Sequence, residues 1–276
     1  ATHITKQAEE DASPAMLRWV EGFTNKINCS VCEGTRLKKE ALYFKIDGKP
    51  VYMKGANYIP SDAFLSRVTK KEYEKIVLSA KDANMNMLRV WGGGIYENDY
   101  FYDLCDKNGI YVWQDFMFAG TMVPRDKAFF DNVKQEVQYQ VKRLRHHPSI
   151  VLWCGNNESD EAFKNWGWMK SFKISKQDSI RLWKDYRRLF HDSIPKWVKE
   201  VDDKRPYLSS SPLHHWSKAK CVTEGDSHYW GLWWGWEDIE AVQKKTGRFV
   251  SEYGMLSLPN YSSVESFTSP EDRHLY

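Results

Sequence analysis

Short apolar runs alternate with longer mixed segments from about residue 41 onward. Seven runs rich in β-branched, aromatic and other apolar residues predict strands. These predicted strands are 51–57, 87–92, 110–116, 150–156, 206–211, 226–231 and 248–254. Between them, apolar residues recur at three- and four-residue spacing and predict helices. The predicted helices are 69–84, 98–109, 127–147, 180–202 and 236–247. Nearly continuous apolar strands that alternate with helices indicate parallel strands buried on both faces.

Two architectures fit this alternation, the open doubly wound sheet and the (β/α)8 barrel. No GxGxxG or phosphate loop follows a predicted strand, which weakens the first. Polar and aromatic residues gather where the predicted strands end, and a barrel brings all those ends to one face. We therefore expect an α/β fold of the (β/α)8 TIM-barrel type. Because only seven strands are recognisable, the barrel is expected to be incomplete at its C-terminal end.

The first forty residues differ from the rest in being polar and mixed, with one short amphipathic helix predicted at 13–27. The domain prediction is an N-terminal polar, helical extension at 1–40 and a partial TIM-barrel domain at 41–276. Those first residues are also the candidates to replace the missing eighth strand.

Composition narrows the function classes. The net charge of +3 is too small to indicate a nucleic-acid partner, and the apolar runs fall short of the roughly 18 residues of a membrane helix. Aromatic residues make up 15%, with 13 Trp, and they cluster in "HYWGLWWGW" at 228–236. Large core residues explain a high aromatic content, but such a cluster beside glycines is also typical of a surface that stacks on sugars.

Two predicted strands end on a glutamate. "IVLWCGNNES" at 150–159 leads to Glu158, and "RFVSEYGM" at 248–255 leads to Glu252. In a barrel the ends of the fourth and seventh strands face each other across the mouth. A pair of carboxylates there suits glycoside hydrolysis, in which one acts as proton donor and the other as carboxylate.

Longer blocks then carry a family resemblance. "KGANYIPSDAF", "NMLRVWGGGIYENDYFYDLCDKNGIYVWQDFMFA", "VKRLRHHPSIVLWCGNNE" and "FVSEYGM" resemble the catalytic barrel of β-mannosidases in glycoside hydrolase family 2. The resemblance covers roughly 41–268. It implies a retaining, exo-acting enzyme that releases terminal β-linked mannose from oligosaccharides and glycoconjugates without a cofactor. It also implies a lysosomal or secreted location for animal members, and β-sandwich domains that this chain lacks and that would be supplied elsewhere.

The resemblance assigns roles to individual residues. Glu158, which follows Asn157 as in the "NE" motif of the wider clan, would be the acid/base with a raised pKa, and Glu252 would be the nucleophile. Asn157 would bond the sugar 2-OH, and Arg89 would be the charge partner of the nucleophile. The expected contacts of the mannose ring and its hydroxyls are Trp91, Asp115, His228 and Trp230. For each of these four, a purely structural role is an equal alternative.

No metal is expected. The pairs His146–His147 and His214–His215 place neighbouring side chains in different directions, which favours solvent or loop roles. Cys29 and Cys32 form a CxxC without the second pair that a zinc site needs.

Two rival functions remain open. One is a truncated, non-catalytic barrel that binds a glycan or a protein partner. The other is a related retaining β-glycosidase that acts on galactosides or glucuronides.

Overall fold

The computed structural model describes residues 45–46, 48–255 and 259–273, and the chain divides into units at 1–51 and 52–276. In the first unit, β1 (Lys45–Ile46) and β2 (Lys49–Pro50) form a short antiparallel pair. The extension predicted at 1–40, with its helix and its CxxC, lies outside the described residues. The domain boundary at 40 therefore stays a prediction.

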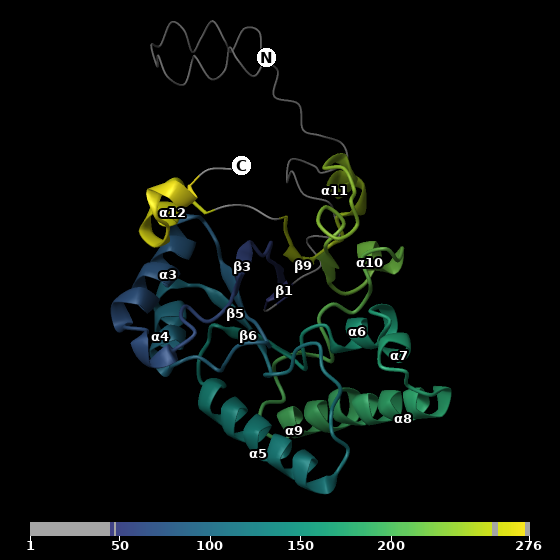
Figure 1. Cartoon of the computed structure of the whole chain (residues 1–276). Coiled ribbons are helices and arrows are strands. Elements are labelled where there is room, and N and C mark those ends of the chain that lie inside the picture. The colour runs from purple at the N-terminus through teal and green to yellow at the C-terminus, as the bar shows by residue number, and fades with distance from the viewer. Residues whose placement is uncertain (1–44, 47, 256–258, 274–276) are drawn as a thin grey trace, which may run out of the picture. The chain divides into compact units, whose positions relative to one another are not determined.

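Seven parallel strands form the second unit, in two sheets (Figure 1). The larger sheet has the order β3-β4-β5-β6-β7, and the smaller one pairs β8 with β9. The strands are β3 (Gly55–Tyr58), β4 (Met87–Val90), β5 (Tyr111–Asp115), β6 (Ile150–Cys154), β7 (Tyr207–Leu208), β8 (Ser227–Tyr229) and β9 (Val250–Tyr253). Six of them lie within strands predicted from the sequence, β3 extends one residue beyond its predicted range of 51–57, and the consecutive order is that of a TIM barrel.

The barrel is not closed. Among the described residues, no strand ladder joins β7 to β8 or β9 to β3. Side chains make these connections instead. Asn57 Nδ2 donates to Ser251 O at 3.1 Å between β3 and β9, and Ser211 Oγ, beyond β7, donates to Asp226 Oδ2 at 2.6 Å beside β8.

The helices follow the strands in the predicted alternation. They are α3 (Lys70–Asp82), α4 (Asp99–Asn108), α5 (Lys127–Leu144), α6 (Ser159–Asn165), α7 (Trp168–Ser171), α8 (Lys176–Arg187), α9 (Ile194–Lys199), α10 (Lys220–Thr223), α11 (Glu240–Lys245) and α12 (Tyr261–Phe267), with short turns η2 (Leu65–Arg67) and η4 (Pro270–Asp272). Side-chain caps begin several of them, such as Thr69 at α3 and Asp126 at α5. In the described part of the chain, no helix has the length and apolar character needed to cross a membrane.

The helix predicted at 180–202 is interrupted. A π-helical segment, η3 (Arg188–Ser193), separates α8 from α9, and Pro195 stands in the first turn of α9. Proline offers no N–H and its ring crowds the preceding turn, so a wider turn just before it relieves that clash.

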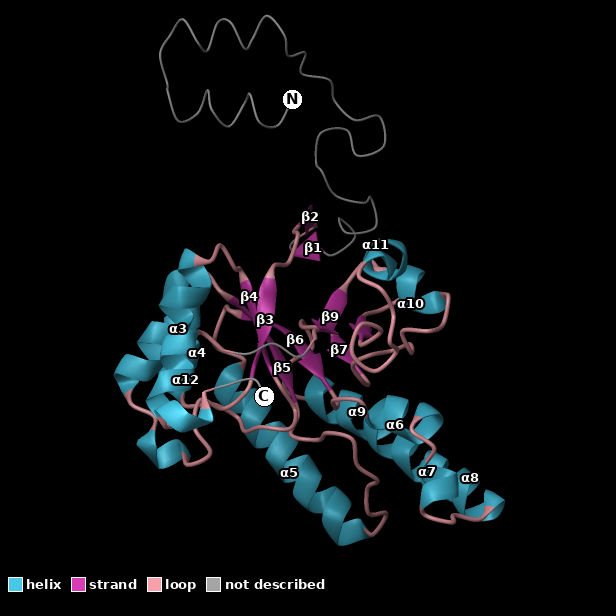
Figure 2. Ribbon diagram, turned by 45° about the horizontal axis from the view of Figure 1, so that its top comes forward, coloured by secondary structure: helices cyan, strands magenta, loops and turns pink. Residues whose placement is uncertain are grey.

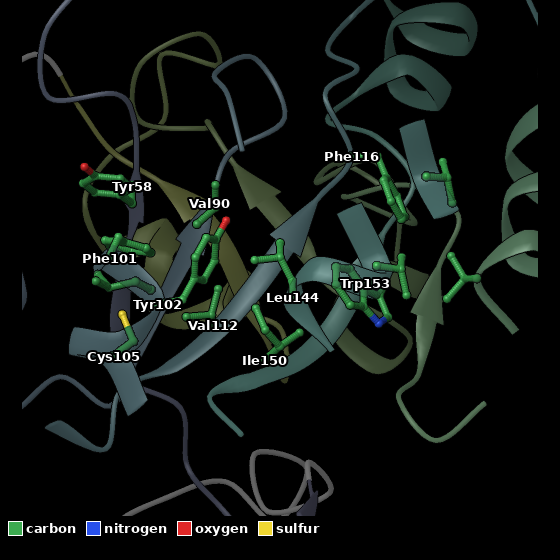
Figure 3. Close-up of a cluster of buried hydrophobic side chains, with 14 of the residues drawn as sticks. Tyr58, Val90, Phe101, Tyr102, Cys105, Val112, Phe116, Leu144, Ile150 and Trp153 are labelled. Carbon is green, nitrogen blue, oxygen red and sulfur yellow. The ribbon is translucent and has the colours of Figure 1, made fainter. Parts of the chain in front are cut away.

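The core lies between the larger sheet and the helices that cover it. Figure 3 shows Val112 and Ile150 from the strands against Leu144, Phe101 and Tyr102 from the helices, all 2% exposed or less. Helices α3 and α4 lie together beside β3 and β4, and α5 packs along α9 (Figure 2). Burial of this apolar surface, at roughly 25 cal/mol per Å2, holds the sheet rigid beneath the strand ends.

Candidate active site

The polar stretch after β6 begins at Gly155, where neighbouring atoms leave no room for a side chain. A Cβ at Gly155 would lie 2.4 Å from the Tyr207 hydroxyl and 2.5 Å from Ser209 O, so only glycine fits there. Asn156, fully buried, then ties three segments together. Its Nδ2 donates to Ser209 O at 2.9 Å, and its Oδ1 accepts from Ser159 N and Ser210 Oγ at 3.0 and 2.8 Å. The first of the two adjacent amides is therefore structural.

Glu158 is the residue at which the chain turns from the sheet into α6. Its backbone is left-handed, with φ 57° and ψ 8°, and such a conformation costs about 1–3 kcal/mol in a residue other than glycine. Two backbone hydrogen bonds of 2.7 Å hold it there, from Glu158 N to Ser211 O and from Ala162 N to Glu158 O. The side chain, 17% exposed, lines the cleft described below.

The register of the smaller sheet positions the second glutamate, Glu252. β8 and β9 pair so that His228 stands opposite Glu252. His228 Nδ1 lies 2.8 Å from Glu158 Oε1 and 3.3 Å from Glu252 Oε2. One oxygen of each carboxylate and one His228 nitrogen all lie within 4.8 Å of one another. Two carboxylates that come from distant parts of the sequence therefore share one small volume.

Arg89 holds the floor of this site. Its Nη1 donates to Glu252 Oε1 at 2.8 Å and to Asn57 Oδ1 at 3.2 Å. Its Nη2 donates to Asp115 Oδ2 and Asn157 Oδ1, each at 2.8 Å, and its Nε donates to Asp115 Oδ1 at 3.4 Å. All five guanidinium hydrogens are thus used. Burial acts to lower the pKa of Arg89, but the adjacent carboxylates outweigh it and raise that pKa above its usual range.

Asp115, one of the expected sugar contacts, and Arg89, the expected charge partner of Glu252, lie beneath the cleft. Asp115 is fully buried, and besides Arg89 it accepts from Trp113 Nε1 at 2.8 Å and Gly92 N at 2.9 Å. Neither Asp115 nor Arg89 lines the cleft. Parallel strands place alternate side chains on the inner face, where these two neutralise each other. Asp115 and Arg89 therefore support the site from below.

The cleft itself has a volume of about 730 Å3. Its lining includes four of the expected residues besides the two glutamates, namely Asn157, Trp91, His228 and Trp230. Four further aromatic side chains also line it, namely Trp166, Trp216, Tyr253 and Trp234, the last of which belongs to the aromatic cluster at 228–236. An aromatic wall around a few convergent polar groups is typical of a small-molecule site.

A polar pair on the cleft wall was missed by sequence reasoning. Glu161, one turn beyond Glu158, lies with its Oε1 3.2 Å from His215 Nε2, and Asn165 Nδ2 donates to its Oε2 at 2.9 Å. Burial, and after it the charge of Glu158, raises the pKa of Glu161 to about 7, against the hydrogen bond from Asn165. Burial also lowers the pKa of His215. The spacing from Glu158, one turn of a helix that starts in the cleft, is the sequence signal that would have found Glu161.

A second missed group stands behind His228. Ser211 Oγ lies 2.9 Å from His228 Nε2 and 2.6 Å from Asp226 Oδ2, and Ser251 Oγ also donates to Asp226 Oδ2 at 2.6 Å. Ser211, Asp226 and His228 are at most 2% exposed. No motif marks them, because serines after a strand are common in every fold.

Two clusters in the described part of the chain bring three carboxylate and imidazole atoms within 4.8 Å. One is Glu158, His228 and Glu252, where Arg89 already pairs with Glu252. The other is Asp103, Asp106 and His147, where His147 Nδ1 lies 2.7 Å from Asp106 Oδ2 and ties α4 to the turn before β6. Hydrogen bonds account for both clusters, and the expectation of a metal-free site stays a prediction.

Comparison with known proteins places this geometry in a family. The chain is 43% identical to a β-mannosidase of Bos taurus over 247 residues and 41% identical to one of Mus musculus over 245 residues. Each match covers 84% of this chain and 27% of the relative, so the chain spans about a quarter of the length of these relatives.

Solved structures agree. A crystal structure of β-D-mannosidase from Dictyoglomus thermophilum superposes with a TM-score of 0.72 at 43% identity, and covers 83% of this chain and 27% of that one. A Bacteroides uniformis β-glucuronidase, at 18% identity and a TM-score of 0.55 over 74% of this chain and 24% of its own, shares the fold alone. Residues 36–224 match the description "Glycosyl hydrolases family 2, TIM barrel domain". The chain therefore belongs to glycosyl hydrolase family 2 and carries the TIM barrel domain of that family.

Proposed function

We propose that this chain is the catalytic part of a retaining, exo-acting β-mannosidase that hydrolyses terminal β-mannose from oligosaccharides and glycoconjugates. One observation carries the proposal, namely that oxygens of Glu158 and Glu252 lie within 4.8 Å of each other in the cleft. Retaining enzymes hold their carboxyl groups about 5–5.5 Å apart, whereas inverting enzymes leave about 6.5–9.5 Å for a water. The spacing supports a retaining mechanism.

The surroundings of each carboxylate support its proposed role. Glu252 accepts from Arg89 at 2.8 Å, so a positive charge lies beside the carboxylate that is proposed as nucleophile. Glu158 has no cationic side chain of this kind within hydrogen-bonding distance. It faces His228 and the amide of Asn157, whose Nδ2 lies 3.3 Å from Glu158 Oε2. We assign Glu158 as acid/base.

The mechanism then runs in two steps. Glu252 attacks the anomeric carbon while Glu158 protonates the departing oxygen, and a glycosyl-enzyme forms. Glu158 next takes a proton from water, which attacks the same carbon and releases the sugar with its configuration retained. The Oδ1 of Asn157 accepts from Arg89, so its amide nitrogen, 3.3 Å from Glu158 Oε2, is the atom proposed to donate to the sugar 2-OH.

Mannose is proposed as the sugar because the two relatives and the similar solved structure are named for it. The aromatic lining, including Trp91 and Trp230, offers flat apolar faces on which a pyranose ring stacks. The partner is thus a β-mannoside oligosaccharide. The lysosomal or secreted location implied by the resemblance remains a proposal as well.

A panel of aryl β-glycosides tests the sugar and the activity together. We expect turnover of the β-mannoside and at least about 100-fold lower kcat/KM for the galactoside and glucuronide. Turnover of another sugar instead would identify a sibling glycosidase. A folded chain that turns over none but binds mannosides would be a non-catalytic glycan-binding barrel.

Azide rescue of alanine variants distinguishes the roles of the two glutamates. Glu252→Ala removes the nucleophile, so kcat should fall by more than about 10⁴-fold on every mannoside. Glu158→Ala removes the proton donor, at a cost of about 10²–10⁴-fold for unactivated substrates, but an acidic phenol leaves without help. In Glu158→Ala, azide should attack the glycosyl-enzyme and restore turnover, and the product should be β-mannosyl azide. In Glu252→Ala no glycosyl-enzyme forms, so azide could only displace the leaving group directly and give α-mannosyl azide. The opposite assignment of products would reverse the two roles.

A further inference from the structure

The hydrogen bonds behind His228 determine where its protons lie. Asp226 accepts from three donors, namely Leu213 N at 3.1 Å and the hydroxyls of Ser211 and Ser251, each at 2.6 Å. A serine hydroxyl has one hydrogen, and at 2.6 Å from a carboxylate oxygen that hydrogen must lie between the two atoms. Ser211 Oγ is then an acceptor toward its other neighbour, His228 Nε2 at 2.9 Å. His228 therefore carries a hydrogen on Nε2.

Arg89 does not change this assignment. Its Nη1 lies 3.4 Å from His228 Nε2, but the two hydrogens of Nη1 are donated to Glu252 Oε1 at 2.8 Å and Asn57 Oδ1 at 3.2 Å. No hydrogen of that nitrogen is left for His228, and two donors do not bond each other.

The other ring nitrogen then requires a shared proton. With Nε2 protonated, Nδ1 of a neutral imidazole is an acceptor, yet it faces Glu158 Oε1 at 2.8 Å and Glu252 Oε2 at 3.3 Å. Acceptors 2.8 Å apart repel unless a proton lies between them. Glu252 already receives a hydrogen from Arg89, so the proton belongs to the closer pair, Glu158 and His228.

The charges around His228 agree with this count. The charged and titratable groups that face it are Glu158, Glu252, Arg89, Asp226 through Ser211 and, farther along α6, Glu161. These groups are four carboxylates and one guanidinium, so negative charge predominates around the imidazole.

We propose that Ser211 and Asp226 are positioning residues that fix His228 with its hydrogen on Nε2, so that Glu158 and His228 together hold the proton used in catalysis. The proposal rests on the proposed function. In the first step the pair gives its proton to the departing oxygen as the C–O bond breaks and Glu252 bonds to the anomeric carbon. The pair is left as a carboxylate and a neutral imidazole, and it regains one proton from water in the second step.

The kinetic test compares two serines. Ser211 and Ser251 both donate to Asp226 Oδ2 at 2.6 Å, but only Ser211 contacts His228. We expect Ser211→Ala to lower kcat/KM by about 30-fold for β-linked mannobiose, which needs a proton, and by less than about 3-fold for 2,4-dinitrophenyl β-mannoside, which does not. Ser251→Ala should change both substrates by the same factor, and Ser211→Thr, which keeps the hydroxyl, should restore the wild-type ratio.

The ratio between the two substrates is the deciding readout. A merely structural serine would lower kcat/KM for both substrates by the same factor. Equal losses on both substrates for Ser211→Ala and Ser251→Ala would overturn the proposal.

An NMR measurement separates this proposal from the proposed function. In 15N-histidine-labelled protein, with His228 assigned by comparison with His228→Gln, we expect Nε2 to carry hydrogen. Asp226→Asn offers an amide donor to Ser211, which turns the serine hydrogen toward Nε2 and moves the ring hydrogen to Nδ1. A wild-type spectrum in which Nε2 carries no hydrogen would refute the proposed role of Ser211 and Asp226, even if mannosides are hydrolysed. A protonated Nε2 with no mannoside turnover would instead refute the proposed function, and the proposed hydrogen-bond arrangement behind His228 would remain.

Discussion

Glu161 gives the cleft a pH-dependent effect on stability at the scale of one residue. Burial raises its pKa to about 7, so the folded chain binds this proton more tightly than the unfolded chain. The resulting stability is fully present below the ordinary glutamate pKa of about 4.3 and is lost as the pH rises through 7. Because water reaches the cleft, we expect the loss to be roughly 2 kcal/mol.

Urea denaturation at pH 5 and pH 8 tests this sign. Wild type should lose about 2 kcal/mol more than Glu161→Gln over that range, since the amide does not titrate. Glu240→Gln, at an exposed position in the first turn of α11, is the matched control and should follow wild type. If Glu161→Gln loses as much stability as wild type, the proton is not held at Glu161.

The residues of the site differ in how far their positions could be predicted. Glu158 and Glu252 follow apolar runs within specific motifs, so sequence reasoning singled out both as candidates, and both line the cleft. Ser211 and Asp226 follow no periodic pattern, and their place behind His228 depends on how the end of β7 meets β8 in space. For Asp115, sugar contact and a structural role were equal alternatives, because strand ends predict a face of the barrel but do not tell whether a side chain lies above or below a neighbour such as Arg89.

At the scale of elements, the joint between β6, β7 and α6 depends on one buried amide. Asn156→Ala would leave Ser159 N, Ser209 O and the Ser210 hydroxyl without their partner. Unsatisfied buried groups cost about 1–3 kcal/mol each, and partial relaxation reduces their sum, so we expect the free energy of unfolding to fall by about 3 kcal/mol.

A second asparagine serves as control for that joint. Asn98 caps α4 by accepting from Tyr100 N at 3.0 Å at an exposed position. Asn98→Ala should cost about 1 kcal/mol, the ordinary value of a helix cap. Equal losses for the two variants in denaturant titrations would show that the joint carries no special stability.

Element prediction succeeded where apolar periodicity was long and failed where elements are short. All seven parallel strands lie at predicted positions, because each is an apolar run between polar segments. Helices α6, α7, α10 and α12 have four to seven residues and were missed. Segments of that length hold too few turns to show a period, and tertiary contacts rather than propensity keep them helical.

At the scale of the molecule, seven strands were predicted, but the way their sheets meet was not. The contact between β9 and β3 joins residues nearly two hundred positions apart in the sequence, and no local pattern encodes such a contact. The structure joins the two sheets through side chains such as Asn57 and Arg89, which reach Ser251 and Glu252. The two carboxylates proposed for catalysis therefore come from two sheets that no described ladder unites.

This construction predicts uneven stability across the barrel. Strands β5 and β6 are flanked by ladders on both sides, whereas among the described residues β9 has a ladder to β8 alone. Amide hydrogens at 250–253 should therefore exchange faster than those at 111–115.

Asn57→Ala removes the hydrogen bond to Ser251 O, worth about 1 kcal/mol, and should speed exchange in β9 about fivefold while leaving β5 unchanged. Asn86→Ala is the matched control, since its side chain bonds only the backbone of Tyr52 and Lys54 and should leave β9 exchange unaltered. Hydrogen exchange followed by mass spectrometry measures both segments at once. Equal protection of β5 and β9, or an equal response to the two asparagine variants, would mean that the sheets unfold as one unit despite the missing ladder.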